Sequence, residues 1–176
     1  MTSSDLPTLL LVDDEPDILL SLEGLLRREF RLFTAENGTD ALQIVQAESI
    51  QVILSDQRMP DMMGDELLAQ VARLSPATIR ILLTGYADIQ DVIRALNTGG
   101  LYRYLTKPWD LDELKSVLED AVELYSQHQR REDLNREKMK FAEDILAFLQ
   151  TLPISDEVTA LIDRGNRLMT LEATNT

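Results

Sequence analysis

Five polar side chains that could share one chemical task follow four separate apolar runs of the sequence. These runs lead to the pair Asp13 and Asp14, to Asp56, to Thr84 and to Lys107. Three carboxylates held together repel one another, so a cation is expected among them. Because carboxylate oxygens are hard ligands, the expected ion is Mg²⁺, which keeps several waters and uses one or two carboxylates.

This combination of side chains is suited to phosphoryl transfer. Charge that develops on the oxygens of the transferred group must be neutralised, and Lys107, a metal ion and the Thr84 hydroxyl could do so. An aspartate oxygen can itself be the nucleophile and form an aspartyl-phosphate. Taken singly, Asp14 could cap a helix and Asp56 could be a turn residue, while Thr84 and Lys107 could end a strand and occupy a surface loop. Their joint position after four apolar runs favours one functional site.

Five apolar runs are predicted strands: Leu9–Val12, Arg31–Thr34, Gln51–Ser55, Ile79–Leu83 and Tyr102–Leu105. Apolar residues at helical spacing follow each run, and glycines and prolines mark the turns. This alternation predicts an α/β fold, a (βα)5 unit with a doubly wound parallel sheet covered by helices on both faces. The carboxyl ends of such strands share one edge, where ligands bind. We therefore expect the five polar side chains to meet there.

The fourth and fifth predicted helices lie in the later part of the chain. The fourth helix is predicted from Ile89, Val92, Ile93 and Leu96, with a stop at the glycines that follow. The fifth begins near Asp110, which with Glu113 resembles a capping box. Its apolar stripe is Leu111, Leu114, Val117, Leu118, Ala121, Val122 and Tyr125.

Composition excludes several classes of protein. The 176 residues carry a formal net charge of -14, so direct nucleic-acid binding is not expected. The chain has no cysteine and one histidine, His128, which excludes disulfides, thiolate chemistry and a multi-histidine zinc site within one chain. No apolar run approaches the roughly 20 residues that span a bilayer, and no secretory start is visible. We expect a soluble cytoplasmic protein.

Four segments of the chain resemble the receiver domain of bacterial two-component response regulators, a flavodoxin-like fold. They are LLLVDDEPDI, VILSDQRMPDMMGDELL, IRILLTGYAD and YRYLTKPW, and the resemblance covers about residues 7–127. It implies the strand order 2-1-3-4-5 and a phosphorylation-operated switch rather than an enzyme. A histidine kinase or phosphotransfer protein would be the phosphoryl donor. The stretch from Tyr86 to Trp109 is most similar to receivers attached to cyclic-dinucleotide phosphodiesterase or hydrogenase-regulating outputs.

The resemblance also implies a role for each site residue. Asp56 would be the phospho-acceptor, and Asp13 and Asp14 the acidic pair around Mg²⁺, with Asp14 the favoured direct ligand. The list is completed by the backbone carbonyl of Arg58 as a metal ligand, Thr84 as the switch hydroxyl, Lys107 as the partner of the phosphoryl group and Tyr104 as the rotating aromatic. The bond from Lys107 to Pro108 is expected to be cis. Without the resemblance, we would expect Tyr104 to be a core aromatic.

Residues 128–176 follow the predicted receiver domain of residues 1–127 as a helical extension. A charge-rich break at 126–140 precedes a second apolar stripe of Phe141, Ile145, Phe148, Leu149 and Leu152, and a short helix with Val158, Leu161 and Ile162 is expected after Ser155. One helix cannot bury this stripe by itself. The extension could pair with a second chain as a homodimer, dock a partner, fold back on the receiver, or lead to an output in a longer protein. We favour a dimer or partner-docking element.

Two other functions are weighed against the switch. In Mg²⁺-dependent phosphohydrolases of the aspartyl-phosphate type, the nucleophile lies on the first strand and a second aspartate follows two residues later. Residue 15 is Glu15 here, and the richer motif surrounds Asp56 on the third strand. A phosphorylation-independent adaptor would not need the complete set of polar residues. We therefore expect a signalling switch that assists its own phosphorylation and dephosphorylation.

Overall fold

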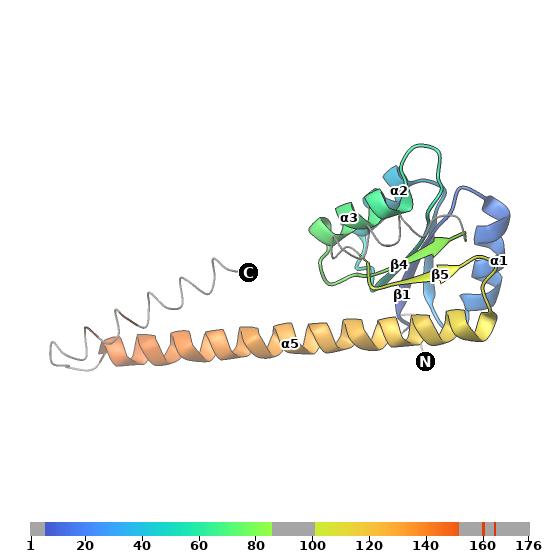
Figure 1. Ribbon diagram of the computed structural model, residues 1–176. Coiled ribbons are helices and arrows are strands. Elements are labelled where there is room, and N and C mark those ends of the chain that lie inside the picture. Colours follow the sequence, from blue (N-terminus) through green and yellow to red (C-terminus); the bar gives the residue numbers. More distant parts are fainter. Residues whose placement is uncertain (1–5, 86–100, 152–159, 161–163, 165–176) are drawn as a thin grey trace. The chain divides into compact units, whose positions relative to one another are not determined.

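A parallel five-stranded sheet lies at the centre of the first compact unit of the chain, residues 1–129 (Figure 1). The computed structural model describes residues 6–85 and 101–151, together with residues 160 and 164. In chain order its elements are β1 (Thr8–Val12), α1 (Pro16–Leu26), β2 (Arg31–Ala35), α2 (Gly38–Ala47), β3 (Val52–Asp56), α3 (Gly64–Leu74), β4 (Ile79–Thr84), β5 (Arg103–Thr106) and α5 (Leu111–Thr151). The strand order is β2-β1-β3-β4-β5, which confirms the predicted order.

The pairing of the strands brings their carboxyl ends to one edge. Val12 is paired with Ala35 on one side and with Ser55 on the other, so β1 and its two neighbours end together. Asp56 is paired with Leu83, the residue before Thr84. The residues that follow β1, β3 and β4 are therefore neighbours at this edge, as the alternation of strands and helices predicts.

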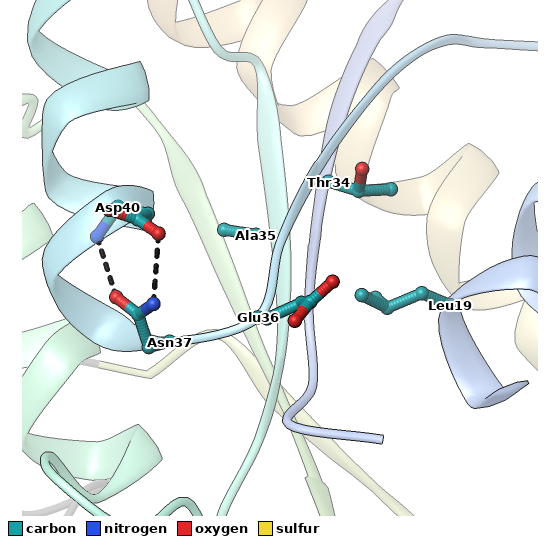
Figure 2. Close-up of a pocket in the computed structure, with 6 residues that line it drawn as sticks. All are labelled: Leu19, Thr34, Ala35, Glu36, Asn37 and Asp40. Atoms are coloured by element: carbon teal, nitrogen blue, oxygen red, sulfur yellow. Dashed lines mark hydrogen bonds between the residues drawn. The ribbon is translucent and has the colours of Figure 1, made fainter. Parts of the chain in front are cut away.

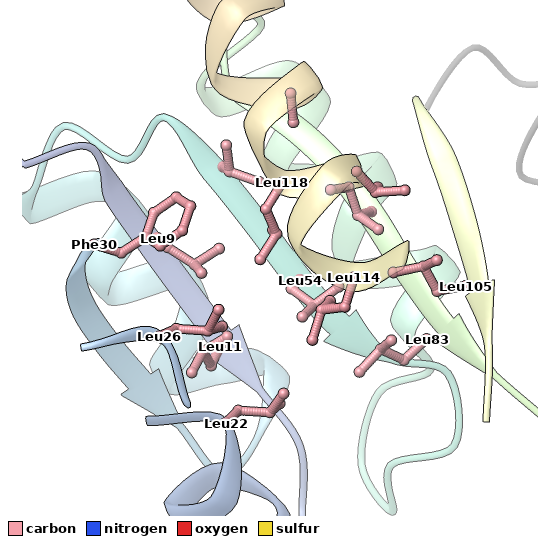
Figure 3. Close-up of a cluster of buried hydrophobic side chains, with 14 of the residues drawn as sticks. Leu9, Leu11, Leu22, Leu26, Phe30, Leu54, Leu83, Leu105, Leu114 and Leu118 are labelled. Atoms are coloured by element: carbon pink, nitrogen blue, oxygen red, sulfur yellow. The ribbon is translucent and has the colours of Figure 1, made fainter. Parts of the chain in front are cut away.

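Alternate residues of each strand point into two separate apolar layers. Leu9 and Leu11 of β1 lie in the layer beneath α1 and α5, whereas Leu10 and Val12 lie in the layer beneath α2 and α3. Figure 3 shows the first layer, in which Leu114 of α5 lies among leucines of the strands and of α1. Burial on both faces explains why the strands are almost continuously apolar.

The starts of three helices follow local sequence rules. Pro16 occupies the first turn of α1, where its missing N–H costs no hydrogen bond. The Asn37 side chain accepts a hydrogen bond from the backbone N–H of Asp40 and so caps α2. Oδ1 of Asp110 accepts from two backbone N–H groups in the first turn of α5. The residue before α1 is Glu15, which makes no side-chain cap, so the alternative of Asp14 as the helix cap is not observed.

Helix α5 is continuous over 41 residues and runs through the charge-rich stretch at 126–140. The charge-rich stretch therefore interrupts the apolar stripe but not the helix. The stretch contains no glycine or proline, and its Arg, Glu, Lys and Gln residues favour a helix even without an apolar stripe. The chain divides into two compact units, residues 1–129 and residues 130–176, with the boundary inside α5. None of the described helices has an apolar run long enough to cross a membrane.

Some expectations fall on residues outside the described part of the chain. They are the fourth helix with Ile89, Val92, Ile93 and Leu96, the residue Tyr86, the end of the second stripe at Leu152, and the short helix with Val158, Leu161 and Ile162. These remain predictions from the sequence.

Candidate functional site

Asp13 is held in place immediately after β1. Its carboxylate is 1% exposed, and Oδ1 accepts a hydrogen bond from the backbone N–H of Glu15 at 3.0 Å. Its own N–H donates to the carbonyl of Ala35 on β2 at 3.2 Å. Oδ2 lies 2.9 Å from Nζ of Lys107. Burial without such partners would be costly for a charged group, so these contacts stabilise the carboxylate.

Asp56 is the last residue of β3 and contacts two donors. Its Oδ1 lies 2.5 Å from Nζ of Lys107, and its Oδ2 accepts the backbone N–H of Arg58 at 2.6 Å. Only 7% of the residue is exposed. Both oxygens are thus oriented by charge-assisted hydrogen bonds, which are shorter and stronger than neutral ones.

Lys107 joins the two carboxylates. Its backbone N–H donates to the carbonyl of Thr84 at 2.8 Å, and the peptide bond to Pro108 is cis, as the resemblance to receiver domains implies. Burial alone would lower the pKa of the Lys107 ammonium, but its hydrogen bonds to Asp56 and Asp13 outweigh this effect. The pKa of Lys107 is therefore raised above its usual value, and the side chain is charged at neutral pH.

Thr84 ends β4, the strand that pairs with β3 next to Asp56. It is buried, and its hydroxyl is 3.2 Å from the carbonyl oxygen of Gly85. Because Asp56 is paired with Leu83, Thr84 comes one residue beyond that pair at the carboxyl edge of the sheet. This is the position from which a threonine hydroxyl could reach a group attached to the neighbouring strand end.

Two predicted site residues lie outside this buried cluster. Asp14 follows Asp13 directly but is exposed to solvent. Tyr104 lies on β5 and is 45% exposed, so the alternative of a core aromatic is wrong. The reason is topological, because β5 is an edge strand of the sheet.

The pattern of charge at this edge fits a divalent cation. Lys107 can neutralise only one of the carboxylates of Asp13, Asp14 and Asp56. Among residues 6–85 and 101–151, no three His, Cys, Asp or Glu side chains converge as a metal-binding group. Mg²⁺ does not require three, because it is usually held by one or two carboxylates together with waters and other oxygens. The buried pair Asp13 and Asp56 meets that requirement.

Two residues that the sequence did not single out complete the site. A Cβ added to Gly64, the first residue of α3, would lie 2.1 Å from the backbone oxygen of Asp56, so no other residue fits without movement. Gln57, directly after Asp56, is 1% exposed although it is polar. In the sequence, both residues look like ordinary members of a loop. The one signal that could have found them is that they lie close to Asp56 in the chain.

A separate hollow of about 360 Å³ lies at the carboxyl end of β2 (Figure 2). Its lining residues are Leu19, Thr34, Ala35, Glu36, Asn37 and Asp40. The side chains of Asn37 and Asp40 face each other there and are joined by a hydrogen bond of 2.8 Å. These polar groups serve the start of α2, and the hollow shares no lining residue with the cluster around Asp56.

Comparisons with known proteins agree with this geometry. The model of the response regulator receiver domain matches residues 9–119. The hydrogenase transcriptional regulatory protein HoxA of Bradyrhizobium diazoefficiens is 40% identical over 118 residues, which are 67% of this chain and 24% of that protein. The DNA-binding transcriptional regulator NtrC of Proteus hauseri is 32% identical over 157 residues, 89% of this chain and 32% of that protein. The chain thus spans 24% to 32% of the length of these two regulators.

A solved structure shares the same fold. The signal receiver domain of an HD domain-containing protein from Pseudomonas fluorescens Pf-5 is 39% identical, with a TM-score of 0.68. The match covers 71% of this chain and 93% of that chain. With a family match over residues 9–119 and a buried aspartate, Asp56, at the carboxyl edge of a 2-1-3-4-5 sheet, the chain belongs to the response regulator receiver family of two-component systems.

Proposed function

We propose that this chain is a cytoplasmic, Mg²⁺-dependent phosphorylation switch in which Asp56 accepts a phosphoryl group from a histidine kinase or phosphotransfer protein. The observation that carries the proposal is the arrangement of Asp56, with Lys107 on one carboxylate oxygen and the backbone N–H of Arg58 on the other. The receiver function is assigned to residues 1–127, and residues 128–176 form a separate extension.

In the proposed transfer, an oxygen of Asp56 attacks the phosphorus atom of a phosphohistidine. The bond from phosphorus to the imidazole nitrogen breaks, and the nitrogen keeps the bonding electron pair and is protonated as it leaves. Lys107 then pairs with the phosphoryl oxygens, and the Thr84 hydroxyl donates a hydrogen bond to them. Burial of Asp56 strengthens both interactions, because they act in a medium of low dielectric constant.

The residues that would hold Mg²⁺ are Asp13, Asp14, Asp56 and the backbone carbonyl of Arg58. When bound, the ion supplies positive charge that stabilises the oxygens of the transferred group. Asp14 is the exposed member of this set and is available from the solvent side. The ammonium of Lys107 contacts the carboxylates of Asp13 and Asp56 and neutralises one of their two negative charges. A further cation would neutralise the remaining negative charge.

The signal would leave the site through Thr84 and Tyr104. Movement of the Thr84 side chain toward a phosphoryl group on Asp56 vacates space on the side of β5, and Tyr104 turns inward from its exposed position to fill that space. Phosphorylation would then shift a population between two packings of the face that contains β5 and the start of α5. The fourth helix, which the sequence predicts as a further part of this face, lies outside the described residues. A partner or an output domain would bind that face in one of its two packings.

The extension is proposed to pair with a second copy of the chain as a homodimer. Leu134, Phe141 and Phe148 are exposed and lie seven residues apart on α5, and Ile145 lies between the last two. Apolar residues at this period favour a two-stranded coiled coil. Residues 128–176 hold seven basic and nine acidic residues, so two copies repel one another far less than two receivers would.

Intact mass after incubation with acetyl phosphate and Mg²⁺ tests the switch. We expect one stoichiometric, base-labile phosphoryl group that is absent from Asp56→Asn and present in Asp61→Asn, a matched change at an exposed aspartate of the same loop. We also expect Trp109 fluorescence to respond, because its ring lies 6.0 Å from Nζ of Lys107. No phosphoryl group in the unmodified chain would reject the proposal and leave the phosphorylation-independent adaptor.

A Mg²⁺-dependent phosphohydrolase remains the second alternative function, and the same incubation separates it from the switch. Sustained release of phosphate from diverse phosphate esters would favour the hydrolase. A single turnover that stops at a stable covalent product would favour the switch. The location of the buried acceptor on β3 rather than β1 supports the switch.

A further inference from the structure

We propose that Gln57 is a positioning residue that fastens the loop between β3 and α3, residues 57–63, over the phospho-acceptor. The inference rests on the proposed function of Asp56 and adds a residue to its machinery. Gln57 directly follows Asp56 in the chain, and its side chain makes its hydrogen bonds at the start of α3. Three observations carry the inference, namely its burial, its partners and the helix end that it serves.

The Gln57 amide makes two hydrogen bonds to the same residue. Its Oε1 accepts the backbone N–H of Asp65 at 3.1 Å, and its Nε2 donates to Oδ1 of Asp65 at 3.3 Å. We call this pair of contacts the Gln57–Asp65 clasp. A buried amide needs partners for both its donor and its acceptor, and Asp65 supplies both. Removing the amide would leave a polar group of Asp65 without its present partner.

The N-cap residue supplies no side-chain partner to α3, and the clasp supplies one to the N–H of Asp65 instead. Oδ1 of Asp65 itself accepts from the next N–H, that of Glu66, at 3.0 Å. The first backbone N–H groups of a helix have no partners within the helix, and a polar side chain at the N-cap usually accepts from one of them. The N-cap residue of α3 is Met63, which has no polar atom able to do this and makes no side-chain cap. Gln57, at the opposite end of the loop, accepts a hydrogen bond from the N–H of Asp65 in the first turn of α3.

The backbone around the clasp connects three elements of the site. The N–H of Gln57 donates to the carbonyl of Leu83 on β4, the residue before Thr84, at 2.9 Å. The carbonyl of Gln57 accepts the N–H of Gly64 at 2.9 Å, which closes the loop at its base. Gly64 in turn approaches the backbone of Asp56 too closely for a Cβ. The two ends of the loop are therefore held together by main-chain and side-chain bonds.

Arg58 lies within this closed loop and depends on it. Its N–H orients Oδ2 of Asp56 at 2.6 Å, and its carbonyl is the proposed backbone ligand of Mg²⁺. Loss of the clasp would allow the loop to move relative to Asp56, so both contributions of Arg58 would weaken. The expected effect is lower affinity for the metal rather than loss of the acceptor carboxylate.

The test compares Gln57→Met with the full-length unmodified chain. Methionine keeps the length of the side chain and removes both hydrogen bonds. We expect the Mg²⁺ concentration that half-saturates the Trp109 response to rise by about tenfold, as is typical when a partner of a metal ligand is lost. Amide exchange of Arg58 and Gly64, measured by NMR, should become faster. Gln43→Met, the same change at an exposed position of α2, should alter neither measurement.

A second substitution separates positioning from simple stabilisation of α3. Met63→Ser supplies a local N-cap and should restore the thermal unfolding midpoint in the Gln57→Met background. If Gln57 positions the loop, the raised half-saturating Mg²⁺ concentration persists in this double variant. Recovery of Mg²⁺ affinity together with the midpoint would overturn the proposal, as would an unchanged Mg²⁺ affinity in Gln57→Met. Should Gln57→Met fail to fold, Asp65→Ala removes the bond from Nε2 of Gln57 together with that from the N–H of Glu66, and the same readouts apply.

Failure of the clasp and failure of the switch give different results. If the unmodified chain takes no phosphoryl group from acetyl phosphate, the proposed function fails. If the unmodified chain is phosphorylated but Gln57→Met matches it in Mg²⁺ dependence and amide exchange, only the clasp is rejected.

Discussion

The carboxyl edge of the sheet and the exposed part of α5 depart from ordinary burial in opposite directions. At the edge, the polar residues Asp13, Asp56 and Thr84 are buried. Along α5, the side chain of Phe141 is 67% exposed, and Leu134 and Ile145 are also exposed. Buried polar groups and exposed apolar groups are the two observations that say most about function, because both are costly without a reason.

The difference between these regions lies in where the compensating contacts are found. Asp13 and Asp56 find theirs within the chain, in Lys107 and in nearby backbone N–H groups. The exposed residues of α5 are proposed to find theirs on a second copy. Substitutions at the edge should therefore act on the chain itself, whereas substitutions along α5 should act on its assembly.

The largest effect on stability is expected where the backbone is most crowded. Gly64→Ala places a Cβ against the backbone oxygen of Asp56 and should lower the free energy of unfolding by about 1–3 kcal/mol, the usual cost of overpacking. Gly24→Ala is the matched control, because nothing lies within 4 Å of its added Cβ and alanine favours helices. It should raise stability by up to about 1 kcal/mol.

Urea unfolding followed by circular dichroism measures both glycine variants. Equal stabilities for Gly64→Ala and the unmodified chain would contradict the close approach of α3 to the backbone of Asp56. The Gly64→Ala variant should also be phosphorylated more slowly, since the added methyl displaces the loop that contains Arg58.

A smaller effect is expected along α5, and it should be confined to assembly. Replacing Leu134 and Phe141 together by serine removes two apolar contacts per chain and should weaken self-association by at least about tenfold, or 1.4 kcal/mol. The thermal midpoint of the receiver should not change. Leu20→Ser, at an exposed leucine of α1, provides the control.

Sedimentation at several concentrations measures this assembly. If Leu20→Ser weakens association as much as the double variant does, the interface lies on the receiver and not on α5. If the unmodified chain is a monomer throughout, the proposed homodimer is wrong.

The smallest effect is a pH dependence at the edge. The pKa of Lys107 is raised in the folded chain, so its contribution to stability is fully present below the unfolded pKa of about 10.4 and is lost as the pH rises through the higher folded value. The unmodified chain should therefore lose stability more steeply than Lys107→Met above about pH 10. Parallel curves in urea unfolding would show that Lys107 is not held by the two carboxylates.

Much of the fold and site could be predicted because parallel strands align the residues that follow them. Asp56 comes after the apolar run 51–55, and Asp13 after the first apolar run, so a correct assignment of the strands already brings both to one edge. Each strand boundary lies within one residue of its prediction, which leaves the site residues at the carboxyl ends.

The features that were not predicted depend on contacts rather than on periodicity. The close approach of Gly64 to Asp56 and the bonds between Gln57 and Asp65 require the path of a seven-residue loop, which no spacing rule specifies. The helical nature of the extension, by contrast, is predicted from the sequence. Helix α5 runs into it through residues 126–140, because that stretch contains neither glycine nor proline.

The identity of the phosphorylated residue tests the central claim most directly. Borohydride reduces an aspartyl-phosphate to homoserine, so treatment of the phosphorylated chain followed by peptide mapping locates the acceptor. We predict homoserine at position 56 alone, with formation dependent on Mg²⁺. Homoserine at position 13 or 14, or at no position, would contradict the assignment of Asp56 as the acceptor of this receiver.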